Sequence, residues 1–178
     1  MIFYKVILAI GPDKPGIIST VSAFLTERNC NIEDSRMSII GEEFALFLLF
    51  SGPFNSIEKV KNDIKGLEQK SGLTVLLKDT KPPKNKGKEP AIPYKIDVIG
   101  MDHPGIVNEI TGIFHKNNIN VVNLESDVSN APVSGTALFH MHIKIDVPVS
   151  LSISALKEEL AKAEKHSNLN IALSAIEP

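Results

Sequence analysis

The sequence lacks the features of a secreted, membrane-spanning or nucleic-acid-binding protein. It contains one cysteine, Cys30, so an intrachain disulfide is excluded and a reducing compartment is favoured. No run of about 18 apolar residues occurs, which excludes a membrane-spanning helix. The formal net charge is only -2, which argues against a chain that binds nucleic acid or an anionic membrane through its overall charge.

Targeting and catalytic signatures are also missing. No basic region precedes the first apolar run and no small-residue cleavage site follows it, so we expect a cytoplasmic protein. There is no phosphate-binding Gly-Lys-Ser loop, no Cys-x-x-Cys pair and no clear nucleophile–base pair. We therefore predict no enzyme activity, no catalytic residue and no cofactor. Cys30 has no histidine near it in the sequence and is interpreted as structural.

What the sequence does contain is an internal repeat. Residues 10–32, IGPDKPGIISTVSAFLTERNCNI, align without a gap on residues 99–121, IGMDHPGIVNEITGIFHKNNINV. The identical pairs are Ile10 with Ile99, Gly11 with Gly100, Asp13 with Asp102, Pro15 with Pro104, Gly16 with Gly105, Ile17 with Ile106, Asn29 with Asn118 and Asn31 with Asn120. We interpret the chain as a duplicated domain.

A segment rich in Pro, Lys and Gly separates the two copies and is typical of a solvated linker. We place the first domain at residues 1–80, the linker at 81–92 and the second domain at 93–178. The lysines of the linker also allow a nucleic-acid patch, but a short charged linker is usually only solvated.

Each copy predicts the element order βαββαβ. In the first copy, strand 2–10 ends at Gly11-Pro12 and a helix follows with Pro15 in its first turn. Strand 31–40 alternates as an edge strand does, and Ser56 is placed to cap the second helix. The remaining strands are expected at 44–50 and 73–79, and in the second copy at 94–100, 119–129, 135–147 and 169–176, with Ser150 or Ser152 capping its last helix.

This order predicts an α+β fold, with two ferredoxin-like sandwiches in tandem, each a four-stranded sheet with two helices on one face. A unit of about 80 residues has a thin core, so we expect the copies to pack together and the chain to form a homodimer.

The loop Gly-x-Asp-x-Pro-Gly-Ile, at residues 11–17 and 100–106, is the main candidate for function. Its glycines allow close approach of backbone or unusual dihedrals, and the first amides of the following helix suit a small carboxylate. The carboxylate of Asp13 or Asp102 would meet an ammonium group, so the loop suits an α-amino acid. The loop is also an ordinary way to begin a helix.

These residues resemble the ACT domain family, small-molecule-binding regulatory modules; DKPGII with NCNI carries the match in the first copy, and DHPGIV with NINV in the second. The resemblance implies an amino-acid site, usually at an interface between two ACT units, lined by this loop and by the Asn that opens the second strand. Carried over, its residues are Gly11, Asp13, Lys14, Pro15, Gly16, Ile17 and Asn31, then Gly100, Asp102, His103, Pro104, Gly105, Ile106 and Asn120.

The length, the two-copy layout and the segment APVSGTALFHMHIKIDVP are most similar to the glycine cleavage system transcriptional repressor family. This resemblance implies a regulator that senses a small amino acid, with glycine as the first candidate. It would contact a protein partner such as a DNA-binding activator, and would bind neither DNA nor membrane itself. The alternative is a ligand-free ACT-type module that only binds a protein.

Two other interpretations are weaker, and a third stays open beside the ligand role of the two asparagines. His140 and His142 are two positions apart on a predicted strand and therefore share one face, which would allow them to bind a metal. No third ligand is evident, so no metal site is predicted. RNA-recognition domains share the βαββαβ order, but Phe44 and Phe47 point to opposite faces here and the basic residue of their signature is missing. Asn31 and Asn120 can also simply bond backbone at a turn.

Overall fold

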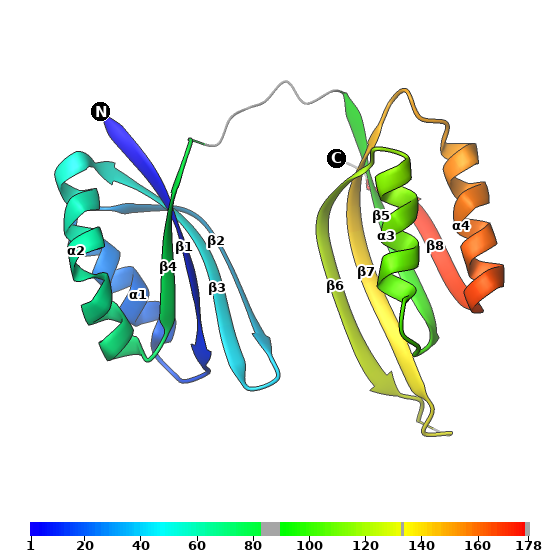
Figure 1. Cartoon of the computed structure of the whole chain (residues 1–178), viewed down its shortest axis with the longest axis horizontal. Coiled ribbons are helices and arrows are strands. Elements are labelled where there is room, and N and C mark those ends of the chain that lie inside the picture. Colours follow the sequence, from blue (N-terminus) through cyan, green and yellow to red (C-terminus); the bar gives the residue numbers. More distant parts are fainter. Residues whose placement is uncertain (83–89, 133, 177–178) are drawn as a thin grey trace. The chain divides into compact units, whose positions relative to one another are not determined.

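The protein folds into two compact units, one on either side of residues 83–89 (Figure 1). The structure, a computed structural model, describes residues 1–82, 90–132 and 134–176. Most of the predicted linker 81–92 therefore lies outside the described residues, and its boundaries stay predictions.

Both units have the element order βαββαβ that the sequence predicts. Unit 1 contains β1 (Ile2–Pro12), α1 (Ile17–Thr26), β2 (Asn31–Ile40), β3 (Glu43–Pro53), α2 (Phe54–Ser71) and β4 (Thr74–Thr80). Unit 2 contains β5 (Ala91–Met101), α3 (Ile106–Lys116), β6 (Asn120–Asn130), β7 (Ala137–Pro148), α4 (Ile153–Ser167) and β8 (Leu169–Ala175).

Each unit is one antiparallel sheet with both helices on one face (Figure 1). The strand order is β2-β3-β1-β4 in unit 1 and β6-β7-β5-β8 in unit 2, so β2 and β6 are edge strands. The two sheets also share an irregularity in strand register. The register shifts between Ile32 and Asp34 in β2, and it shifts at the aligned positions Val121 and Asn123 in β6. The α+β, tandem ferredoxin-like fold is confirmed.

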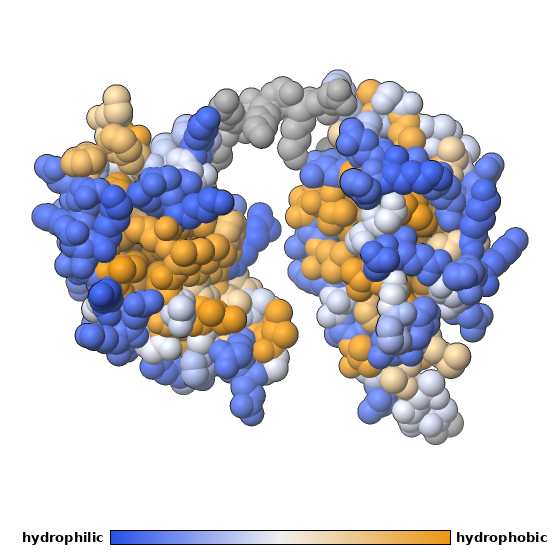
Figure 2. Space-filling view, viewed as in Figure 1, coloured by the Kyte–Doolittle hydropathy of each residue, from blue (hydrophilic) through white to orange (hydrophobic). Residues whose placement is uncertain are grey.

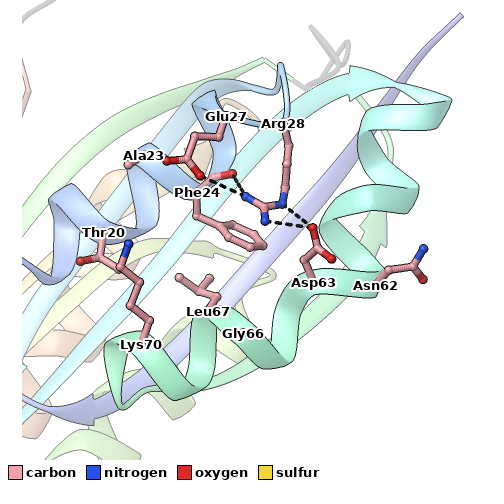
Figure 3. A pocket seen from close by; sticks show the side chains of 10 residues that line it. All are labelled: Thr20, Ala23, Phe24, Glu27, Arg28, Asn62, Asp63, Gly66, Leu67 and Lys70. Atoms are coloured by element: carbon pink, nitrogen blue, oxygen red, sulfur yellow. Dashed lines mark hydrogen bonds and ion pairs between the residues drawn. The ribbon is translucent and has the colours of Figure 1, made fainter.

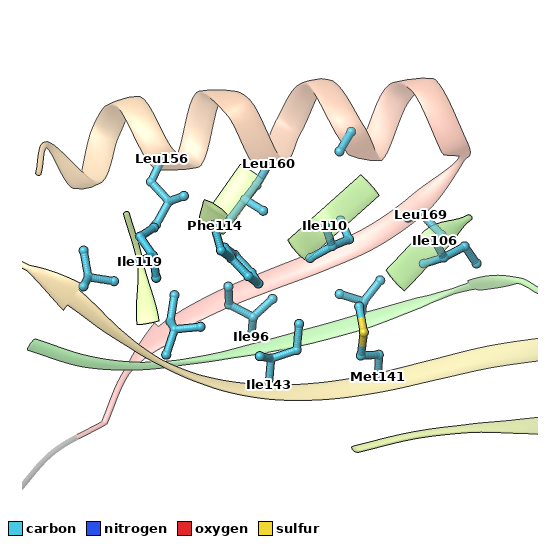
Figure 4. Packing of buried hydrophobic residues seen from close by; sticks show 14 of the residues in the cluster. Ile96, Ile106, Ile110, Phe114, Ile119, Met141, Ile143, Leu156, Leu160 and Leu169 are labelled. Carbon is cyan, nitrogen blue, oxygen red and sulfur yellow. The ribbon is translucent and has the colours of Figure 1, made fainter. Parts of the chain in front are cut away.

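Every unit has its own core between the sheet and its helices. In unit 2 the side chains of Ile110, Phe114 and Leu160 point from the helices onto Ile96 and Met141 of the central strands (Figure 4). Alternation along the central strands places one side of each strand in this core, and each fully buried aliphatic side chain contributes about 1.5–3 kcal/mol relative to exposure. Among the described residues no helix is long and apolar enough to cross a membrane.

In both units a glutamate near the end of the second helix bonds the last strand. Glu68 near the end of α2 accepts a hydrogen bond from the backbone amide of Val75, with Oε1 and N 2.8 Å apart. The equivalent Glu164 of α4 accepts one from Ile171 at 2.6 Å. These bonds fix the last strand of each sheet to the preceding helix.

Several local expectations need correction. β1 includes Gly11 and Pro12, which pair with Phe44 and Glu43, so the strand is two residues longer than predicted and ends at Pro12. Pro15 precedes the N-cap Gly16 and lies outside the helix. Ser56 does not cap α2, because that helix begins at Phe54 and Ser56 is already buried inside it. The predicted cap at Ser152 is confirmed, since its side chain accepts a bond from Ala155 N at 3.4 Å.

Candidate functional site

The first glycine of each loop is enclosed by its own unit. A Cβ on Gly11 would lie 2.8 Å from the carbonyl oxygen of Gly72, in the turn before β4. A Cβ on Gly100 would lie 2.5 Å from Leu169 Cδ2 and 3.3 Å from Asn168 O, in the turn before β8. Of the two roles that the sequence left open, these glycines therefore serve a close approach, and the approaching group belongs to the same chain.

The second glycine sets the start of the helix. Gly16 and Gly105 are the N-cap residues of α1 and α3, with φ of 90° and 105°, a left-handed conformation that favours glycine. A Cβ at either position would meet nothing within 4 Å. Ile17 and Ile106 follow and are buried at 3% and 2% exposure, so they anchor the loop in the core.

The two aspartates are held by backbone and are free at the side chain. Asp13 N donates to Glu42 O at 3.1 Å, and Asp102 N donates to Ala137 O at 3.0 Å, which ties each loop to the neighbouring strand pair. Both residues are exposed. Within the described part of the chain neither carboxylate has an ion pair or hydrogen bond, so both are available to a cationic group.

The remaining loop residues differ between the copies. Lys14 is exposed and its Nζ lies over Gly72, 3.1 Å from where a Cβ on that glycine would be. The half-buried His103 has its Nδ1 3.1 Å from the carbonyl oxygen of Pro104. Pro15 and Pro104 are exposed. Of the two loops, only the second therefore carries an imidazole side chain.

The two asparagines lie at the far end of their own sheets. Asn31 pairs with Ser51, while Gly11 pairs with Phe44, seven residues away along β3. At about 3.3 Å per residue the loop and this asparagine are roughly 23 Å apart. Asn120 and Gly100 are separated in the same way on β7. One unit cannot bring both predicted halves of the site to one small ligand.

Antiparallel pairing of two edge strands would bring the halves together. β2 begins at Asn31 and ends level with the loop, because Ile40 and Pro12 both pair with Glu43. An antiparallel neighbour along that edge places its own first residue beside this end. For the predicted site to be complete, a second unit would have to supply one of its halves, as the family resemblance implies.

Asn31 is part of a hydrogen-bonded cluster in unit 1. Its Nδ2 donates to Glu33 Oε1 at 3.1 Å, and the same oxygen accepts a 2.5 Å bond from the buried Ser51 hydroxyl. These two bonds, that of Ser51 first, lower the pKa of Glu33 below its usual value. Unit 2 has Val122 at the aligned bulge position, so this cluster is not repeated there.

The sequence did not predict a groove between α1 and α2, which has a volume of about 510 Å³ (Figure 3). Arg28 crosses it. Its guanidinium lies 3.8 Å from the Phe24 ring centroid, and its Nε and Nη2 donate to Asp63 Oδ2 at 3.0 and 2.9 Å. A fixed stack and ion pair between two helices explain this residue as a structural clamp.

The histidines of β7 have partners on the sheet. His142 Nδ1 lies 2.6 Å from Asp97 Oδ1, and His140 Nε2 lies 3.1 Å from Ser129 Oγ. No cluster of three or more His, Cys, Asp or Glu side chains suited to a metal occurs in the described residues. Cys30 is half-buried, and burial raises the pKa of its thiol.

Known families match both units. Residues 4–78 match one model of the ACT domain, and residues 94–164 match another. The chain belongs to the ACT domain family. It carries two ACT domains in tandem, which confirms the resemblance inferred from the loops.

The similarity to individual proteins extends over both ACT domains. A glycine cleavage system transcriptional repressor of Escherichia coli (strain K12) is 28% identical over 155 residues, which is 87% of this chain and 80% of that protein. The crystal structure of a candidate glycine cleavage system transcriptional repressor is 28% identical, covers 100% of this chain and 99% of its own, and has a TM-score of 0.75. An unknown protein from Galdieria sulphuraria, 25% identical, covers 99% and 100% with a TM-score of 0.81.

Proposed function

We propose that this tandem ACT protein is a non-enzymatic regulator that senses a small amino acid, with glycine the first candidate. The observation that carries the proposal is the 28% identity over 87% of the chain to a protein named as a glycine cleavage system transcriptional repressor. Because that identity covers most of both ACT domains, the regulatory role is transferred on the whole chain and not on a single module.

The proposed ligand site is the loop of one ACT domain together with the asparagine that opens the second strand of another. The exposed carboxylate of Asp13 or Asp102 would receive the ammonium group. The first amides of α1 or α3, beyond the left-handed glycine, would receive the carboxylate. The roughly 23 Å between loop and asparagine within one domain favours a ligand held between two domains.

An interfacial ligand can act as a signal. An amino acid that binds one arrangement of two domains tenfold better than another shifts their equilibrium by about 1.4 kcal/mol. We propose that this shift changes the affinity for a protein partner such as a DNA-binding activator, in the cytoplasm, without direct contact of the chain to nucleic acid. Assembly into a homodimer is part of the proposal.

The aspartates provide the test. Asp13→Ala and Asp102→Ala each remove an exposed carboxylate that has no partner within the described residues, so the melting temperature should change little. Calorimetric titration with the amino acid should show at least about tenfold weaker binding for the variant of the copy that binds. Glu42→Ala, which alters another exposed carboxylate beside the loop but keeps its backbone, is the matched control. Unchanged binding in both aspartate variants would refute the capture of the ammonium group.

A second candidate is a ligand-free module that only binds a protein. The observation that favours it is the packing of Gly11 and Gly100 against their own units, since a structural role already accounts for these two glycines. Under this hypothesis no amino acid would alter the stability of the chain, whereas a partner protein would.

A further inference from the structure

The sheet face opposite the helices differs between the two units. In unit 1 the register places Arg36, Phe47, Leu8 and Leu76 in one row across β2, β3, β1 and β4. The next row is Asp34, Leu49, Val6 and Lys78. Directly opposite residues share a face, so the middle of this face is apolar. Phe47 is 50% exposed and Leu76 59% exposed.

The equivalent rows of unit 2 are polar. Glu125, His142, Asp97 and Ala172 replace the first row, and Asn123, Lys144, Lys95 and Ser174 replace the second. The aligned positions therefore exchange Phe47 for His142 and Leu8 for Asp97. Figure 2 shows apolar side chains gathered over β1 and β4 of unit 1. The face of unit 2 is suited to water, and that of unit 1 is suited to an apolar partner.

We propose that the open sheet face of unit 1 is the homodimer interface, and that its occupant is the same face of a second copy. The charges at the edges of the face support a self-complementary contact. Asp34 on β2 and Lys78 on β4 stand at opposite ends of one row. A two-fold axis parallel to the strands lays β2 of one copy over β4 of the other. Asp34 then faces Lys78 of the second copy, and the pair occurs twice.

The polar face of unit 2 is a poorer occupant. Covering Phe47 and Leu8 with a face that carries Asp97 and His142 would desolvate charges without an apolar gain. Like faces, in contrast, bring apolar centres together and leave the charged residues at the rim, which is the usual anatomy of an interface.

The size of the face sets the expected strength. Four strands about 4.8 Å apart and about seven residues long give roughly 20 by 23 Å, or on the order of 900 Å² for both copies together. This lies just below the size of most stable interfaces, so we expect a dissociation constant in the micromolar range. This dimer is the homodimer of the proposed function. Its surface is the sheet face and not the strand edge of the proposed ligand site, so it does not depend on any ligand.

Sedimentation equilibrium of the full chain, from about 1 to 200 µM without ligand, tests the proposal. Phe47→Lys should raise the dissociation constant at least about 30-fold, because it replaces a central aromatic side chain in both copies. His142→Lys, at the equivalent position of unit 2, should leave the constant unchanged. Phe47 is half exposed, so the substitution should not unfold the unit.

A charge exchange tests the orientation. Lys78→Asp should weaken association roughly two- to tenfold, and Asp34→Lys combined with Lys78→Asp should restore it to within about twofold. Both residues are exposed, so this series stands even if Phe47→Lys is unstable. A monomeric wild type over the whole range, or an unchanged constant for Phe47→Lys, would overturn the proposal; absent restoration would overturn the two-fold arrangement. None of these results depends on amino-acid binding, so the sensor hypothesis can fail separately.

Discussion

Replacing the glycines of the first loop separates folding from ligand binding. Gly11→Ala places a methyl group 2.8 Å from the backbone oxygen of Gly72 and 3.2 Å from Leu73 Cα, and neither backbone atom can rotate away. Overpacking of this kind costs about 1–3 kcal/mol, partly offset by the lower flexibility of alanine in the unfolded chain. Gly16→Ala meets no atom within 4 Å, so its cost is that of a left-handed alanine, about 1–2 kcal/mol.

The assay is thermal unfolding of the full chain, followed by urea unfolding for the free energies. A loss of 1 kcal/mol should lower the melting temperature of a unit this size by about 4–8 °C. Gly66→Ala is the matched control, because Gly66 lies inside α2 with open space around it and should gain up to about 1 kcal/mol. If Gly11→Ala is as stable as the control, the close approach does not explain this glycine. Loss of amino-acid binding at full stability would then assign Gly11 to the ligand.

Three further predictions concern individual side chains. The lowered pKa of Glu33 stabilises unit 1 above the carboxyl's unfolded value of 4.5, and this stabilisation is lost as the pH falls through the folded value. Glu33→Gln should therefore flatten the dependence of the urea midpoint on acidic pH; an unchanged dependence would contradict this. Alkylation of Cys30 should be slower in the folded than in the urea-unfolded chain, because burial raises its thiol pKa; equal rates would contradict this. Ile110→Ala should destabilise unit 2 by about 2–5 kcal/mol, and calorimetry should show the transition of unit 1 unchanged.

The fold was predictable because the apolar periodicity and the turn residues indicated the same element order in both copies of the repeat. Strand 31–40 coincides with β2, and its alternation correctly placed it at a sheet edge. The errors lie at element ends. Pro12 still belongs to β1 because it pairs with Glu43 at the start of β3. Ser56, which was predicted to cap α2, lies two residues inside that helix. Such ends depend on tertiary pairing, which a local pattern does not contain.

The candidate site was only partly predictable. Gly16 and Gly105 have the unusual dihedrals that the sequence allowed, but the group that approaches Gly11 comes from a turn some 60 positions along the chain. The separation of Asn31 from its own loop follows from strand register, and the motif alone does not give it. The exposed apolar face of unit 1 could not be predicted from the sequence. A nearly continuous apolar run such as residues 44–50 is equally typical of a strand that is buried on both faces.

The most direct test of the sensor hypothesis is a thermal-shift screen of the full chain against the common amino acids, each at millimolar concentration. A ligand at 100 times its dissociation constant stabilises by about 2.7 kcal/mol, which is a rise of several degrees. We predict a rise with one small amino acid, glycine first, and its loss in Asp13→Ala or Asp102→Ala. An unchanged melting temperature with every amino acid would contradict the sensor hypothesis and would favour the ligand-free module that only binds a protein.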